Sequence, residues 1–346
     1  MTAELIAEFE ACIRRDPAQR GLIASEPLFG PLCPGHLASA AANLAECGRR
    51  VIIVTGFFIP GADPPAAETD GPPGALVLAQ VLQTLGMQTS IVSDRFCFSA
   101  LSKAAECSRY AAARLRLYPD FENSPAGLDR TGRWRSDLLQ PESGAPVSHL
   151  IAIERVGPSH TAESLARQTR GSTAPFEHFD AAVPHEHRNH CHNMRGEIID
   201  LYAGDVHRLF EEIATRCPSA KTIGIGDGAN EIGMGCVPWE DLERRLAGEQ
   251  AGHIPCRIAT DWNIIAGTSN WGAYALAAAV ALLRGNMAAV APFDSRQQEE
   301  VVKYMVVHGP AVDGVTRRQE PTVDGLPFLT YLQPWQAIRS RLGVAE

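Results

Sequence analysis

Five short runs rich in β-branched residues alternate along the chain with segments long enough to form helices. Their nearly continuous apolar character is typical of parallel strands that are covered on both faces. These runs span residues 50–57, 88–94, 148–155, 221–228 and 258–267. A helix is predicted at 73–86, where Pro begins the segment and Gly ends it. We therefore predict an α/β fold with a doubly wound, mostly parallel sheet and helices on both faces, similar to a Rossmann fold.

The chain of 346 residues can bury a sizeable core, and we predict a single domain over 1–346. An insertion at about 158–193 interrupts it, because neither helical nor strand periodicity is evident there. This insertion is rich in histidine and contains His178, His185, His187, His190 and His192. It lacks the Cys partners or HExxH frame of a zinc site, so a metal or catalytic role and a surface loop with incidental histidines are both open.

Composition limits the partners of the chain. A net charge of -9 argues against a nucleic-acid surface and mildly against anionic membranes. The first residues, with Glu4 and Glu8, do not resemble a signal peptide, and the longest apolar run, 274–283, is short for a span of about 20 residues. We expect a cytoplasmic protein with no membrane partner. Assembly into a homo-oligomer is compatible with this composition. The nine cysteines form no CxxC pair and are expected to be reduced thiols.

Polar side chains stand at the predicted carboxyl ends of the strands. In open α/β sheets this edge is where ligands bind. A single polar residue at such a place can simply cap the next helix, but several together favour a binding site. The residues are Thr55, Asp94, Glu154, Asp227 and Asp261.

The segment "GIGDGANEIGMG", residues 224–235, is the most glycine-rich part of the chain. A strand that runs into glycines and then a helix can leave backbone N–H groups free to bind an anion. The segment matches neither the dinucleotide fingerprint nor the P-loop. Asp227 and Glu231 would repel a bare phosphate, so a cation or an amine is favoured beside these two carboxylates. Turn glycines with a carboxylate in the first turn of a helix are the structural alternative.

Two further segments are predicted to contact a ligand. In "GTSNWG", either Ser269 or Asn270 is an N-cap, or both face a carboxylate docked at the helix N-terminus. The Pro- and Gly-rich loop before the helix at Pro72 is of a kind that is often functional. Arg155 and Arg195 are candidates to hold a substrate carboxylate bidentately, or to form ordinary salt bridges. The predicted substrate-contacting residues are Thr55, Gly56, Thr69, Asp70, Arg155, Arg195, Gly226, Ser269 and Asn270.

Taken together, several motifs resemble those of the D-glutamate cyclase-like C-terminal family. They are "TGFFIP…ETDGPPGA", "AIERVGPS", "NMRGEIID", "IGDGANEIGMG", "ATDWNIIAGTSNWGAYAL" and "AVDGVTRRQEPTVDGLP", and they span about 50–330. The resemblance implies a lyase that converts D-glutamate, or a related amino acid, to 5-oxoproline with loss of water. It also implies a metal in an acidic pocket for at least some members. The His-rich insertion departs from the family pattern and bears on the substrate more than on the fold.

Cyclisation of glutamate needs a general base for the amine and a positive group to neutralise the carboxylate that is attacked. The pool of carboxylates is Glu154, Glu197, Asp227, Glu231 and Asp261. Like-charge repulsion disfavours such a pool without a cation. We therefore predict Mg²⁺ or Mn²⁺ held by Glu154, Asp227, Glu231 and Asp261, with Glu154, Asp227 and Glu231 as catalytic residues. The alternatives are a metal-dependent hydrolase of a phosphate ester or lactam, and a non-catalytic protein that binds a small molecule.

Overall fold

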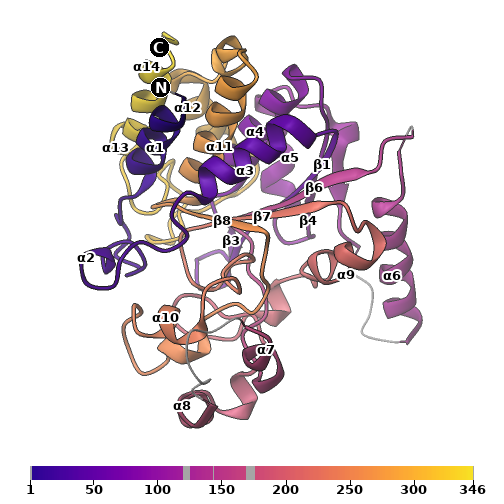
Figure 1. Cartoon of the computed structure of the whole chain (residues 1–346), viewed down its shortest axis with the longest axis vertical. Helices are drawn as coiled ribbons and strands as arrows, with labels where there is room; N and C mark the ends of the chain where they lie inside the picture. The colour runs from indigo at the N-terminus through magenta and orange to yellow at the C-terminus, as the bar shows by residue number, and fades with distance from the viewer. Residues whose placement is uncertain (1, 120–124, 143, 169–175, 346) are drawn as a thin grey trace.

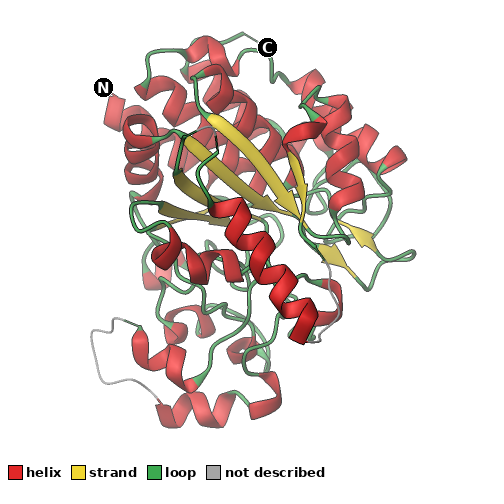
Figure 2. Cartoon of the chain, turned by 90° about the vertical axis from the view of Figure 1, so that its right-hand side faces the viewer, coloured by secondary structure: helices red, strands yellow, loops and turns green. Residues whose placement is uncertain are grey.

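A parallel sheet of six strands runs through the middle of the computed structural model, which describes residues 2–119, 125–142, 144–168 and 176–345 (Figure 2). The strand order across the sheet is β5-β4-β1-β6-β7-β8. Because the chain reverses direction of winding between β1 and β6, this is the doubly wound order, and the predicted fold class is confirmed. The strands are β1 (Arg50–Thr55), β4 (Gln88–Ser93), β5 (Leu115–Leu117), β6 (Val147–Ile153), β7 (Lys221–Gly226) and β8 (Trp262–Ile265).

Successive side chains of a strand pack into two hydrophobic cores, one on each face of the sheet. Val51 and Ile53 of β1 pack into one hydrophobic cluster, whereas Ile52 and Val54 pack into a second cluster on the opposite face. All four side chains are fully buried. This two-sided burial explains why the strand sequences are almost continuously apolar rather than alternating.

Helices cover both faces of the sheet (Figure 1). The upper layer in Figure 1 contains the largely buried α11 and its neighbours. Its helices are α1 (Thr2–Ile13), α3 (His36–Cys47), α4 (Pro72–Thr84), α5 (Phe98–Cys107), α11 (Ser269–Leu283), α12 (Ser295–His308), α13 (Phe328–Tyr331) and α14 (Gln333–Arg341). The other face carries α6 (Pro125–Leu139) and α9 (Arg208–Arg216). The short helix α2 (Glu26–Phe29) and the hairpin of β2 (Phe58–Ile59) and β3 (Ala66–Ala67) lie outside these layers.

The insertion at 158–193 contains more regular structure than the sequence predicted. Helices α7 (Ala162–Arg167) and α8 (Phe176–Ala182) pack Leu165 and Phe179 against Trp239, the first residue of α10 (Trp239–Glu243). Both helices are too short for their periodicity to be recognised. Residues 169–175 of the insertion lie outside the described residues.

One strand boundary and one strand also differ from the sequence prediction. β8 begins at Trp262, four residues later than predicted, and the three-residue strand β5 was not predicted. Among the described residues, no helix combines the length and the hydropathy that crossing a bilayer requires.

Candidate active site

Six buried carboxylates gather near the point where the strand order reverses. They come from the loop after β3, from the ends of β6 and β7, and from the segment before α13. We call Glu68, Asp70, Glu154, Asp227, Glu231 and Asp324 the acidic cluster; each is at most 4% exposed. Arg20, far away in the sequence, enters the cluster. Its Nη1 donates to Asp227 Oδ2 and its Nη2 to Asp324 Oδ1, both at 2.8 Å.

Glu154 follows β6 directly and lies beside the N-terminus of α11. Its φ of 47° places it in the left-handed region, which is uncommon for a residue with a side chain and is often retained for function. Its carboxylate Oε2 accepts a hydrogen bond of 2.7 Å from Ser269 Oγ. This hydroxyl therefore orients Glu154 and favours its ionised form.

The glycine-rich loop after β7 folds Glu231 back over the strand end. Both carboxylate oxygens of Glu231 accept from the Gly228 backbone N–H, each at 3.1 Å. A Cβ atom on Gly226 would lie 1.9 Å from Glu231 Oε2, so only glycine permits this approach. The loop continues without a helix until Trp239, so the structural alternative that places Glu231 in the first turn of a helix does not hold.

The N-cap of α11 is Thr268, whose side chain accepts from Trp271 N at 3.2 Å. The prediction that Ser269 or Asn270 is the N-cap is therefore wrong. Since Thr268 fills this role, the side chains of Ser269 and Asn270 are available for contacts with other elements.

Asp70 occupies the helix N-terminus that was expected to hold a ligand carboxylate. Its Oδ2 and Oδ1 accept from the backbone N–H groups of Ser269 and Asn270 at 2.7 and 2.9 Å. Asn270 Oδ1 in turn accepts from Gly71 N at 3.1 Å and Gly74 N at 2.7 Å. These contacts join the N-termini of α4 and α11 and place Asp70 in the acidic cluster.

A cavity of about 230 Å³ opens onto the acidic cluster. Its acidic wall is formed by Glu68, Glu154 and Glu231. Three guanidinium groups line it as well, those of Arg20, Arg195 and Arg317. Acid–base groups and cations therefore meet in one small space, which is the arrangement that a compact molecule with both an ammonium group and carboxylates would need.

Burial raises the pKa of every cluster member for which a shift is resolved. For Asp227, the charge of Arg20 lowers the pKa, but burial and the neighbouring carboxylates Glu154 and Asp324 outweigh it. For Asp70, burial and the charges of Asp324 and Glu154 raise the pKa well above its usual range. The pKa values of Glu68, Glu154 and Glu231 are also raised, and burial is again the largest cause.

The cluster also contains polar atoms whose bonding capacity is unused. Within the described residues, Glu68 Oε1, Asp227 Oδ1 and Asp324 Oδ2 are buried and have no hydrogen-bond partner. A buried carboxylate oxygen without a partner is costly unless a proton or a cation satisfies it. Both the raised pKa values and the unpaired oxygens therefore indicate that protons or a cation act as the partner of these oxygens.

The geometry is compatible with a divalent cation as that partner. Ligand atoms of Glu154, Asp227 and Glu231 lie within 4.8 Å of one another, as do those of Asp70, Asp227 and Asp324. Asp227 belongs to both sets. Carboxylate oxygens without nitrogen or sulfur donors suit Mg²⁺ or Mn²⁺ rather than Zn²⁺.

Comparison with known proteins agrees with the motifs at these positions. Residues 9–188 and 179–339 match the family described as D-glutamate cyclase-like, C-terminal. The chain belongs to this family. The two matched stretches meet at 179–188, inside the His-rich insertion.

The sequence of a human relative also supports membership of the cyclase-like family. The chain is 27% identical over 345 residues to D-glutamate cyclase, mitochondrial, from Homo sapiens. The match covers 94% of this chain and 50% of the human protein, so the chain spans about half the length of that relative.

Asp261 does not belong to the site of this cyclase-like chain, and its prediction as a metal ligand is wrong. It precedes β8, and its Oδ2 accepts from the backbone N and the Oγ1 of Thr222 near the start of β7, both at 2.8 Å. Its Oδ1 pairs with Lys221 at 3.0 Å. Asp261 directly precedes β8 and contacts the start of β7, so it lies at the amino edge of the sheet, opposite the acidic cluster.

Arg155 is also not placed as predicted. Its Nη2 forms an ion pair of 2.6 Å with Asp94, and its two Nη atoms donate to the backbone carbonyls of Gly56 and Gly204 at 3.0 and 2.8 Å. The buried guanidinium therefore joins β1, β4 and the 200–208 segment, and it does not line the acidic cavity. We correct its predicted role from a substrate ligand to a structural crosslink.

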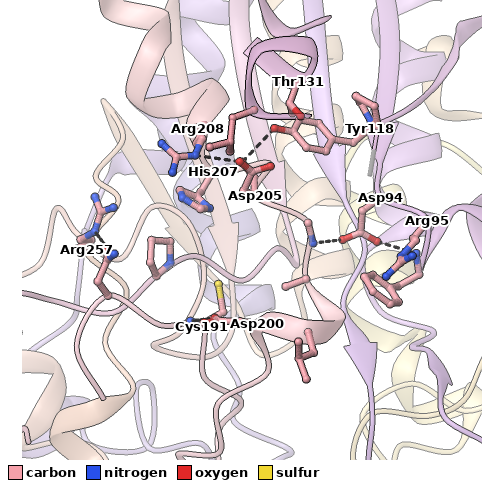
Figure 3. A pocket seen from close by; sticks show the side chains of 18 residues that line it. Asp94, Arg95, Tyr118, Thr131, Cys191, Asp200, Asp205, His207, Arg208 and Arg257 are labelled. Atoms are coloured by element: carbon pink, nitrogen blue, oxygen red, sulfur yellow. Dashed lines mark hydrogen bonds and ion pairs between the residues drawn. The ribbon is translucent and has the colours of Figure 1, made fainter. Parts of the chain in front are cut away.

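A second cavity of about 960 Å³ is bordered by Asp94, the partner of Arg155 in this ion pair (Figure 3). Asp94, Tyr118, Asp205 and His207 line it, and no member of the acidic cluster does. The Asp94 carboxylate accepts from the Gly204 backbone N–H, and Figure 3 shows the Asp205 side chain paired with Arg208. In the larger cavity Asp94 and Asp205 are each paired with an arginine, whereas the acidic cluster contains carboxylate oxygens without a partner among the described residues.

The remaining predicted residues have different positions in the structure. Gly226, Ser269, Asn270 and Asp70 support the acidic cluster through the contacts described, and Thr55 Oγ1 is buried there without a hydrogen-bond partner among the described residues. Thr69 instead donates to the Thr322 carbonyl at 2.7 Å and holds the loop. Arg195 is exposed at the cavity mouth, so a role in substrate binding stays a prediction.

Three functional candidates were not predicted as site residues: Arg20, Glu68 and Asp324. Glu68 and Asp324 lie inside the motifs "ETDGPPGA" and "TVDGLP" that the chain shares with its family, which was a usable signal. Arg20 lies in an N-terminal segment with no motif. Nothing local in the sequence indicates that it reaches the strand ends.

Proposed function

We propose that the chain catalyses the intramolecular dehydration of glutamate, or of a closely related amino acid, to 5-oxoproline. The observation that carries this proposal is the small cavity in which carboxylates of raised pKa face guanidinium groups. Membership of the cyclase-like family and the name of the human relative support the reaction class. The stereochemistry of the substrate and the cytoplasmic location remain predictions.

In the proposed reaction the substrate amine attacks its own γ-carboxyl carbon. The nitrogen forms a bond to carbon, a C–O bond breaks, and two protons pass from the ammonium group to the departing oxygen, which leaves as water. Glu68 is suited to carry these protons because it lines the cavity and its raised pKa makes it a stronger base than a free carboxylate. Arg195 and Arg317 are suited to bind the substrate carboxylates.

Glu154, Asp227 and Glu231 would hold Mg²⁺ or Mn²⁺, since two of these three side chains lie on the cavity wall. A divalent ion supplies Lewis-acid polarisation of a carboxyl oxygen. Ser269 and Gly228 hold Glu154 and Glu231 in position for that role.

The proposal is tested by incubating the chelator-treated protein with D-glutamate or L-glutamate, with and without added Mn²⁺, and following 5-oxoproline by NMR. We expect one enantiomer to be converted, and only with the metal. Hydrolysis of phosphate esters or other lactams without this conversion would favour a hydrolase. Binding of glutamate without any turnover would favour a non-catalytic protein.

Replacing Ser269 by alanine should move the acidic limb of the pH–rate profile to higher pH. Ser269 Oγ donates to the ionised form of Glu154, so its loss raises the pKa of Glu154 further. Protonated Glu154 cannot serve as a metal ligand, and activity should therefore disappear at a higher pH. The control is Ser93→Ala, which removes a buried hydroxyl that donates to the Thr55 carbonyl rather than to a carboxylate. An unchanged limb in Ser269→Ala contradicts the assignment.

Replacing Arg195 by alanine should raise KM about tenfold and leave kcat nearly unchanged, as expected when a carboxylate contact is equally strong in the ground and transition states. Arg195 is exposed at the cavity mouth, so the fold should not be affected. Steady-state kinetics of Arg208→Ala, an exposed arginine of the second cavity, provides the control. Equal KM values for both variants would remove Arg195 from the site.

A further inference from the structure

Two cysteines that are distant in the sequence bring their sulfur atoms together. Cys33 Sγ and Cys236 Sγ are 3.8 Å apart, although 203 residues separate them. Cys236 is exposed and Cys33 is partly buried, and both are free thiols. A small oxidant in solution can therefore reach the pair.

The two thiols are not equivalent. The hydrogen bond from Cys236 and the charge of Arg14 lower the pKa of Cys33, although burial opposes them. The same hydrogen bond, together with burial, raises the pKa of Cys236. The pair therefore places Cys33, the more acidic thiol, in contact with a second thiol, which is the arrangement of a reactive and a resolving cysteine.

The chain around Cys33 can supply the movement that a covalent bond requires. An S–S bond of about 2.05 Å needs the sulfurs to approach by about 1.8 Å. Gly30 and Gly35 flank Cys33, and a Cβ on either would meet open space. Gly235, next to Cys236, is packed so closely that a Cβ would lie 2.3 Å from the Arg257 carbonyl oxygen. The segment of Cys33 is thus the part that can move.

Both cysteines lie on segments that build the acidic cluster. Cys33 ends the stretch that contains Arg20, and Arg14 Nη2 ties the two ends of this stretch by donating to the Leu32 carbonyl at 3.0 Å. Cys236 closes the loop that carries Asp227 and Glu231, with its N–H donating to the Gly233 carbonyl at 3.2 Å. A bond between the sulfurs would fasten one segment to the other beside the site.

We propose that Cys33 and Cys236 are a redox-modification site that forms a reversible disulfide and fastens the Arg20 segment to the glycine-rich loop. With glutathione disulfide as oxidant, Cys33 thiolate attacks one sulfur and releases one glutathione thiolate. Cys236, after losing its proton, attacks the sulfur of Cys33 and releases the second. The two protein thiols lose two electrons and two protons in total, and one glutathione disulfide becomes two glutathione molecules.

The test equilibrates the full reduced chain in buffers of increasing glutathione disulfide to glutathione ratio, then blocks free thiols and maps tryptic peptides without reduction. We expect a crosslinked peptide that contains Cys33 and Cys236, lighter than the two thiol peptides by two hydrogens. The thermal midpoint of the oxidised protein should rise by several degrees, because a crosslink across a long loop restricts the unfolded chain. Dithiothreitol should reverse both changes.

The variants Cys33→Ser and Cys236→Ser should each lose the crosslink and the thermal shift, whereas Cys47→Ser, at an exposed cysteine elsewhere, should retain both. Their thermal midpoints under reducing conditions show whether each variant folds. If Cys33→Ser does not fold, Cys236→Ser alone tests the proposal. Glutathione adducts on single cysteines without a crosslink, or a thermal shift that survives in Cys236→Ser, would overturn the proposal. None of these readouts depends on the proposed cyclase activity.

Discussion

Replacing Arg20 by methionine is expected to lower the free energy of unfolding by about 3–5 kcal/mol in metal-free buffer, the effect of removing one partner from a buried ion pair. Arg20 bridges Asp227 and Asp324 at 2.8 Å each, and both carboxylates are buried. Without the guanidinium group, their charges lose the cation that contacts them. Denaturant unfolding of the chelator-treated wild type and variant measures the difference.

The loss should be larger at pH 8 than at pH 5. Carboxyl groups such as Asp70 and Glu231, whose pKa is raised in the folded state, bind more protons folded than unfolded. Their contribution to stability is therefore complete in acid and is lost as the pH rises through the folded pKa. Protons can therefore replace the missing cation more completely at pH 5 than at pH 8. Arg20→Lys keeps the charge and should recover part of the stability; equal stability of the methionine variant at both pH values would contradict this account.

Replacing Asp227 by asparagine is expected to abolish the stabilisation by Mn²⁺ and to lower kcat/KM at least about 100-fold, the range expected when a metal or an acid–base group is lost. Asp227 is the member shared by both sets of carboxylates that could hold an ion. The variant should remain folded, since it removes one of several like charges and Arg20 keeps its bond to Asp324. Thermal unfolding with and without Mn²⁺ reports binding to the native state.

Asp205→Asn is the matched control for Asp227→Asn, because Asp205 lies in the second cavity and is paired with Arg208. It should retain the Mn²⁺ response. If calorimetric titration of the chelator-treated wild type shows no binding of Mg²⁺ or Mn²⁺, the metal hypothesis fails. The guanidinium groups of Arg195 and Arg317 would then be the groups that neutralise the substrate carboxylates.

Local sequence patterns were sufficient for the architecture and for part of the site. Apolar β-branched runs predict buried parallel strands because each such strand must present hydrophobic side chains to both faces. The residue that follows such a run then lies at the carboxyl edge, and this placed Glu154 and Asp227 correctly without any knowledge of the partners of the strands. The motifs shared with the family also pointed to the loop of Glu231.

The tertiary structure decided which charges meet. Arg20 contacts Asp227 and Asp324 across 207 and 304 residues, and no local pattern encodes a pairing over such separations. Asp261 was predicted at the carboxyl edge, but it directly precedes β8 and therefore lies at the amino edge, where it pairs with the start of β7. Because Thr268 is the N-cap of α11, the Ser269 side chain can donate its hydrogen bond to Glu154. Periodicity and turn residues act between neighbours in the chain, whereas charge balance in a buried cluster depends on every segment that the fold brings to it.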